Sequence, residues 1–169
     1  MSSLDLPETA SSEPAAEAPR KSPSRYEPTL VPRLAAAVQA LNVRFATLLP
    51  EIERDPSASA PGVEECSRQF TAIRQIETVW LYPIVSQAVE ADPAARGELQ
   101  ELRLVGLILA RRVLRCFDEL TQAIRAEVLA ADTAMRLGAA LVKYSNHSER
   151  AVYPLYELVG KESRGVRAA

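Results

Sequence analysis

The chain has 169 residues, of which 47% are hydrophobic and 25% are charged, and its formal net charge is −2. This length suits one domain with a sizeable core, and the nearly balanced charge argues against a basic nucleic-acid-binding protein. Only 5% of the residues are aromatic and six are glycine, whereas alanine, leucine, valine, glutamate and arginine dominate. This composition favours helices over strands, so we expect an all-α protein. From the balanced charge we expect that it binds no nucleic acid.

The two ends of the chain differ in composition from its middle. Residues 1–27 are rich in serine, proline, glutamate and alanine without apolar periodicity, which predicts a disordered N-terminal tail. Gly160 is expected to end the last helix, which leaves residues 161–169 as a flexible C-terminal tail. The sequence shows neither a secretory signal pattern nor an apolar run long enough to cross a bilayer. We therefore expect a cytoplasmic protein without a membrane span.

The first two helices are predicted from apolar residues that recur at intervals of three and four. In the first helix, over about 32–52, these are Val31, Leu34, Val38, Leu41, Phe45, Leu48 and Ile52. A loop is expected over 54–62 because it contains two prolines, and the second helix over about 63–90. Its inward face is assigned to Cys66, Phe70, Ile73, Trp80 and Ile84, with Glu77 in their midst. Pro83 is expected to kink or break this helix.

The third helix, over about 93–129, is expected to begin at the N-cap residue Asp92. It is apolar around more of its circumference than a helix exposed on one side requires. Either it is the most buried helix, or its outer face meets another subunit. Its inward face is assigned to Leu102, Val105 and Leu109. Nearby arginines form either a solvated face or a site for an acidic partner, and these are Arg111, Arg112 and Arg115.

The fourth helix is expected to begin near Asp132 and Thr133, which offer a cap. Its inward face is assigned to Leu137, Leu141, Tyr144, Ser148, Val152, Leu155 and Val159. Two of these residues, Tyr144 and Ser148, are polar and lie one turn apart. Four amphipathic helices with short connections predict an up-down-up-down four-helix bundle over residues 28–160.

Two short motifs resemble a known family. The stretch IRQIETVWLYP, from Ile73 to Pro83, resembles the HxxxE(E)xxLFP segment of hemerythrin-like (HHE cation-binding) domains, and Glu77 matches its bridging carboxylate. The stretch YSNHSERAVYP, from Tyr144 to Pro154, resembles the corresponding part of the fourth helix in that family. The resemblance implies a hemerythrin-like bundle, which in that family holds a pair of iron ions.

The chain departs from this family in its metal ligands. Ile73 and Tyr144 stand where the family has histidine ligands, and Ser148 and Glu149 stand at or next to a carboxylate position. The family's centre uses several histidines, whereas this chain has only His147. We therefore expect a core that has lost most of its metal ligands, with Glu77, Tyr144 and Glu149 as vestigial metal-site residues.

Several roles remain open for the polar residues of the predicted core. Glu77 is interpreted as a buried carboxyl that is either protonated or hydrogen-bonded, accepting from Tyr144 or Ser148; a ligand role and an exposed position are the alternatives. His147 is interpreted as a flanking or surface residue, although one histidine can supply an axial bond to haem. Tyr144 is expected to be structural, with its hydroxyl reaching a partner.

The leading hypothesis is a non-catalytic binding or regulatory module that acts through oligomerisation or a protein partner at the third helix. No nucleophile–base pair or phosphate-binding loop suggests an enzyme. We expect no cofactor. The main alternative is a protein that holds haem, iron or another single metal ion in the bundle through His147, Glu77 or both. A third possibility is a small apolar ligand in the core.

Overall fold

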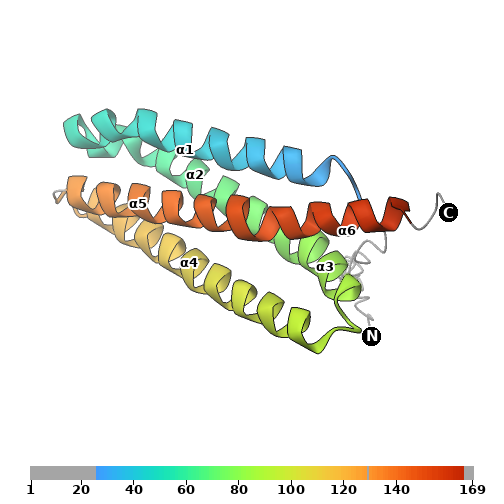
Figure 1. Cartoon of the computed structure of the whole chain (residues 1–169). Coiled ribbons are helices and arrows are strands. Elements are labelled where there is room, and N and C mark those ends of the chain that lie inside the picture. Colours follow the sequence, from blue (N-terminus) through green and yellow to red (C-terminus); the bar gives the residue numbers. More distant parts are fainter. Residues whose placement is uncertain (1–25, 129, 166–169) are drawn as a thin grey trace, which may run out of the picture.

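The computed structural model describes residues 26–128 and 130–165, with side chains described up to Lys161. This part of the chain forms four long helical segments packed together, consistent with a four-helix bundle (Figure 1). The segments are α1 (Leu30–Arg54); α2 (Pro56–Ile76) continued by the π-helical turn η1 (Glu77–Leu81) and α3 (Tyr82–Ala88); α4 (Pro93–Arg125); and α5 (Ala131–His147) continued by the π-helical turn η2 (Ser148–Val152) and α6 (Tyr153–Gly165). None of these helices is both long enough and apolar enough to cross a membrane.

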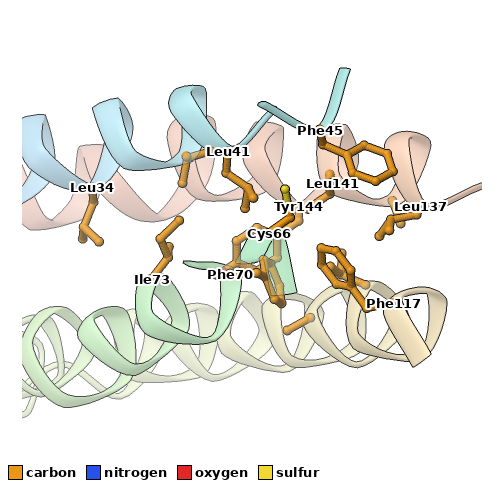
Figure 2. Packing of buried hydrophobic residues seen from close by; sticks show 14 of the residues in the cluster. Leu34, Leu41, Phe45, Cys66, Phe70, Ile73, Phe117, Leu137, Leu141 and Tyr144 are labelled. Atoms are coloured by element: carbon orange, nitrogen blue, oxygen red, sulfur yellow. The ribbon is translucent and has the colours of Figure 1, made fainter. Parts of the chain in front are cut away.

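Aromatic side chains from all four segments meet in the core (Figure 2). The rings of Phe45 and Phe117 pack edge to face with their centroids 6.4 Å apart. Phe70 packs edge to face against Tyr144, with the centroids 4.9 Å apart. The buried face of α1 matches the prediction, since Leu34, Val38, Leu41, Phe45 and Ile52 are all buried. The regular spacing of apolar residues on α1 therefore identified its inward face correctly.

Aspartate side chains cap the N-termini of α2 and α4. Asp92 accepts hydrogen bonds from the backbone N–H groups of Ala94 and Ala95, as the sequence predicted. The loop predicted over 54–62 is wrong, because α2 already begins at Pro56. Asp55 accepts from the N–H of Ala58 at 3.0 Å, and the fixed φ of Pro56 suits the first helical position. Pro56 thus starts the helix rather than breaking the chain, and Pro61 lies inside α2.

Three predicted helix ends also differ from the structure. The third helix ends at Arg125 rather than near residue 129, and Glu127 then adopts a left-handed backbone with φ 53°. α5 begins at Ala131 without a side-chain cap, so Asp132 and Thr133 lie within its first turn. Gly160 does not end the last helix, which continues through Gly165.

The ring of Tyr26 packs against α6 at the N-terminal end of the described chain. It lies 4.8 Å from the ring of Tyr156, centroid to centroid, and leaves no room for a Cβ atom at Gly160. The backbone N–H of Glu27 donates to the Tyr156 hydroxyl at 2.8 Å. Residues 26 and 27, which the sequence assigned to the N-terminal tail, thus contact the bundle. The rest of that predicted tail (1–25) and residues 166–169 of the C-terminal one lie outside the described residues.

A π-helical turn precedes each Tyr-Pro pair. Tyr82 donates its backbone N–H to the carbonyl of Glu77, and Tyr153 donates to that of Ser148, so each bond spans five residues. A proline ring crowds the carbonyl four residues before it, and we attribute the wider turns to Pro83 and Pro154. The kink or break expected at Pro83 is thus observed as the π-helical turn η1.

The turn η1 changes which residues face the core. Trp80, which the sequence placed in the core, is 37% exposed, whereas its neighbour Leu81 is fully buried. A π-helical turn holds more residues than an α-helical one and therefore rotates the residues that follow it. The prediction of Trp80 as a core residue is therefore wrong, whereas that of Ile84, which lies beyond the π-helical turn, is confirmed.

The inward face of α4 is also displaced from the predicted one. Val105 is exposed, while Leu102 and Leu109 are only partly buried. The residues that face the core are Leu99, Gly106, Ala110, Val113, Cys116, Phe117, Leu120 and Ile124. The sequence could not identify this face because large apolar residues surround the first half of the helix, whereas two of its inward residues, Gly106 and Ala110, are small. α4 is therefore not the most buried helix.

We expect Leu81→Ala to lower the free energy of unfolding by about 3 kcal/mol, because it opens a cavity in a fully packed site. The change Trp80→Ala, one residue earlier, should cost about 1 kcal/mol or less. Chemical denaturation followed by circular dichroism measures both. A larger loss for Trp80→Ala than for Leu81→Ala would contradict the rotation introduced by η1.

Candidate functional site

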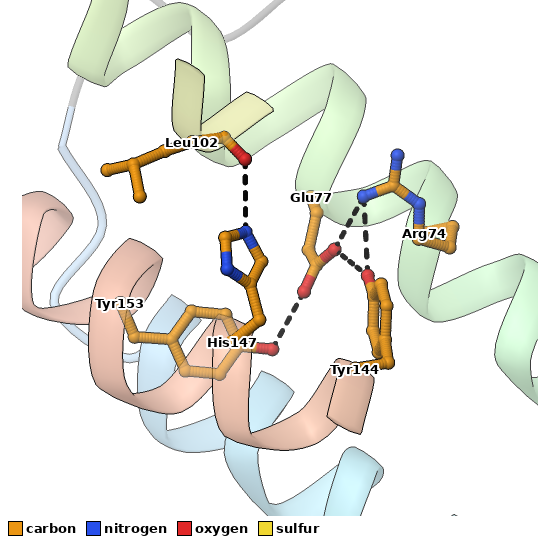
Figure 3. A network of polar contacts seen from close by, with 6 residues as sticks. All are labelled: Arg74, Glu77, Leu102, Tyr144, His147 and Tyr153. Atoms are coloured by element: carbon orange, nitrogen blue, oxygen red, sulfur yellow. Dashed lines mark hydrogen bonds and ion pairs between the residues drawn. The ribbon is translucent and has the colours of Figure 1, made fainter. Parts of the chain in front are cut away.

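The carboxylate of Glu77 lies in the centre of the bundle, and its side chain is only 1% exposed (Figure 3). Its Oε2 atom accepts hydrogen bonds from Arg74 Nη1 at 3.0 Å and from the Tyr144 hydroxyl. Its Oε1 atom accepts from the Tyr153 hydroxyl at 2.9 Å. Three donors from two helical segments therefore hold one carboxylate, which satisfies the general requirement that a buried charge be paired and hydrogen-bonded.

Arg74 supplies the positive charge that balances Glu77. It lies three residues before Glu77, so both side chains project from nearly the same side of the helix. The same Nη1 atom also donates to the Tyr144 hydroxyl at 3.3 Å, and the guanidinium lies over the Tyr144 ring, 5.7 Å from its centroid. The Arg74 side chain is 18% exposed, so this ion pair joins a buried carboxylate to a partly exposed cation. The spacing of Arg74 and Glu77 was the signal that the sequence interpretation missed.

Tyr144 and Tyr153 approach Glu77 from the fourth helical segment, on either side of η2. The predicted contact between Glu77 and Tyr144 is confirmed. Ser148, the other expected donor, is buried but is not among the three donors to the Glu77 carboxylate. Tyr153 was not predicted as a partner, because regular α-helical spacing from Ser148 points to Val152 instead. The wider turn of η2 brings both Val152 and Tyr153 inward.

The electrostatics of the cluster keep both tyrosines neutral and the arginine charged. Burial and, secondarily, the negative charge of Glu77 raise the pKa of the Tyr144 hydroxyl well above its ordinary value, although Arg74 acts in the opposite direction. Burial and Glu77 raise the pKa of Tyr153 in the same way. Burial acts to lower the pKa of Arg74, but its contacts with Tyr144 and Glu77 outweigh this effect and raise it. The tyrosines thus act as hydrogen-bond donors to a carboxylate.

The other residues that the sequence singled out lie apart from this cluster. The imidazole of His147 is half-buried, and its Nε2 atom lies 3.0 Å from the backbone carbonyl oxygen of Leu102 on α4 (Figure 3). Gly106 makes room for the ring, because a Cβ atom there would lie 3.2 Å from His147 Nε2. Glu149 is exposed. The structure therefore brings together Glu77 and Tyr144 but neither His147 nor Glu149.

The donor set does not fit the iron centre that the family resemblance implies. Within residues 26–128 and 130–165, no group of three or more His, Cys, Asp or Glu residues could hold a metal ion. Ile73, at a family ligand position, is a buried apolar residue, and Arg74 already pairs with the one carboxylate in the centre. Ligation of haem by His147 through Nε2 would require that atom to leave the Leu102 carbonyl.

Comparison of the chain with models of known protein families, with curated proteins and with solved structures found no match. The chemical role of the cluster is therefore inferred from its geometry alone. The cluster has one carboxylate whose two oxygens accept from three donors, and no acid or base in it is free to transfer a proton to a substrate. Its physical effect is to join the second and fourth helical segments across the core.

We expect Glu77→Gln to lower the free energy of unfolding by about 3 kcal/mol, because it leaves Arg74 without its counter-charge. Glu149→Gln, which removes an exposed carboxylate from the same region, should cost about 0.5 kcal/mol or less. Denaturant titration measures both, and equal stability of the two variants would contradict the charge pairing.

The raised pKa values of Tyr144 and Tyr153 predict that stability falls at alkaline pH. Above about pH 10 the unfolded chain loses tyrosine protons that the folded chain keeps, so each such group lowers the free energy of unfolding by about 1.4 kcal/mol per pH unit. Tyr153→Phe should reduce that slope by about this amount. Unfolding measured at several pH values between about 9 and 11.5 tests it. An unchanged slope would show that Tyr153 ionises equally easily in both states.

Proposed function

We propose that this protein is a non-catalytic binding or regulatory module, built on an up-down-up-down bundle of hemerythrin-like form, that associates with a second copy of itself through α4. The proposal is supported by an exposed apolar surface on α4 and by the hydrogen bonding of the buried Glu77 carboxylate. The two oxygens of Glu77 are occupied by protein donors, which leaves the centre of the bundle without a free acid or base. Any interaction with another molecule then takes place on the outside of the helices.

The exposed side chains of Leu104 and Ile108 carry this proposal. Leu104 is 57% exposed and Ile108 is 56% exposed, and they lie one turn apart on the side of α4 that points away from the core. Val105 and Leu107 are exposed beside them. Single exposed apolar residues are ordinary, but four in one short stretch form a continuous patch, which is typical of an interaction surface.

The charges around this patch suit a second copy of α4 in antiparallel orientation. If a two-fold axis passes near residue 106, residues at equal distances before and after that point face each other. Glu101 and Arg112 lie at nearly equal distances on either side, and both are exposed. Each copy would place its Glu101 against the Arg112 of the other, with the leucine and isoleucine side chains between the two ion pairs. This arrangement pairs opposite charges around an apolar centre.

Sedimentation velocity across a wide concentration range tests the association. We expect the wild-type protein to dimerise, and the double change Leu104→Glu with Ile108→Glu to give a monomer, because charged side chains would have to be buried without partners. Met135 on α5 is equally exposed, so Met135→Glu is the matched control and should leave the dimer intact. A monomeric wild-type protein, or equal effects of the two sets of changes, would overturn the proposal.

A charge swap tests the antiparallel orientation. Arg112→Glu should raise the dimer dissociation constant roughly tenfold, because it replaces two attractive pairs by two repulsive ones. Combining Arg112→Glu with Glu101→Arg in the same chain restores opposite charges at both ends and should return the constant to within about threefold of the wild type. Failure of the second change to rescue the first would exclude the antiparallel pairing.

A further inference from the structure

A groove with a volume of about 410 Å³ runs between the α2–η1 segment and α4. Its apolar walls are formed largely by Val79, Leu107, Ala110 and Leu114. Threonine and glutamine side chains of the α2–η1 segment complete the lining. The volume lies within the range that small-molecule sites usually have. Leu104 and Ile108 do not line this groove, which lies on the flank of α4 rather than on its outer face.

Two arginines give the groove a positive charge. Arg111 lies on the α4 side and Arg74 on the α2 side, and no carboxylate is among the lining residues. Arg111 forms no ion pair with an acidic side chain of the described part of the chain. Arg74 keeps part of its side chain accessible while Glu77 is fully buried, so the groove faces the cation of this pair and not the anion.

We propose that this groove binds a small amphipathic carboxylate, with its carboxylate on Arg111 and near Arg74 and its alkyl chain along Leu107, Leu114 and Val79. Arginine binds carboxylates through paired hydrogen bonds, which are stronger when the surroundings are apolar. A linear alkyl chain can follow the apolar walls. This proposal does not rest on the proposed self-association, although Leu107 borders both the groove and the exposed apolar patch.

Decanoate is the probe for a calorimetric titration of the full chain below its micelle-forming concentration. We expect saturable binding of decanoate, but none of acetate, which lacks the chain, or of decyltrimethylammonium, which carries the opposite charge. Trp80, the only tryptophan, follows Val79 in the sequence, so its fluorescence offers a second readout. Decyltrimethylammonium binding as tightly as decanoate, or no saturable binding of decanoate, would overturn the proposal.

Paired arginine variants locate the site. Arg111→Gln should weaken decanoate binding about tenfold, because it removes a charged hydrogen-bond donor. Arg115→Gln is the matched control, since Arg115 lies about one turn further along the same helix, is also exposed and does not line the groove. It should change the affinity by less than about twofold. Equal weakening by the two changes, or none by Arg111→Gln, would show that the groove is not the binding site.

Discussion

The buried carboxylate of Glu77 and its three donors are the constraint on which the arrangement of the bundle depends. A charge in the core is costly unless it is paired and hydrogen-bonded, so Arg74, Tyr144 and Tyr153 must all reach one point. Two of these donors come from the fourth helical segment and one from the second. The cluster thereby fixes how these segments face each other, which apolar contacts alone specify less strictly.

The two π-helical turns, which we attribute to Pro83 and Pro154, adjoin this cluster. η1 begins at Glu77 and η2 at Ser148, each shortly before a proline. The wider turn of η2 rotates Tyr153 towards Glu77, and that of η1 buries Leu81 in place of Trp80. Local backbone geometry and the polar cluster are therefore linked. In a regular α-helix Val152 would face the core and Tyr153 would not, whereas after η2 both residues do.

Much of this architecture could be predicted from the sequence, but the partners of Glu77 only in part. Periodic apolar residues identified four helices, the inward face of α1, and the contact between Glu77 and Tyr144. Tyr153 was missed because π-helical turns break the regular spacing on which such predictions depend. The inward face of α4 was misplaced because apolar residues surround this helix. Several of them are exposed on its outer surface. The contacts in the interior of the bundle stabilise the fold, whereas binding on the outside of α4 is our proposal.

The claim that Arg74, and not a metal ion, balances the charge of Glu77 is tested most directly by metal analysis combined with thermal unfolding. Protein purified without chelators should contain less than about a tenth of an equivalent of iron, manganese or zinc. Its unfolding temperature should be the same with a chelator as with each added metal ion, because a ligand that does not bind the folded state cannot stabilise it. Near-stoichiometric metal that raises the unfolding temperature, and that Glu77→Gln abolishes, would contradict the account.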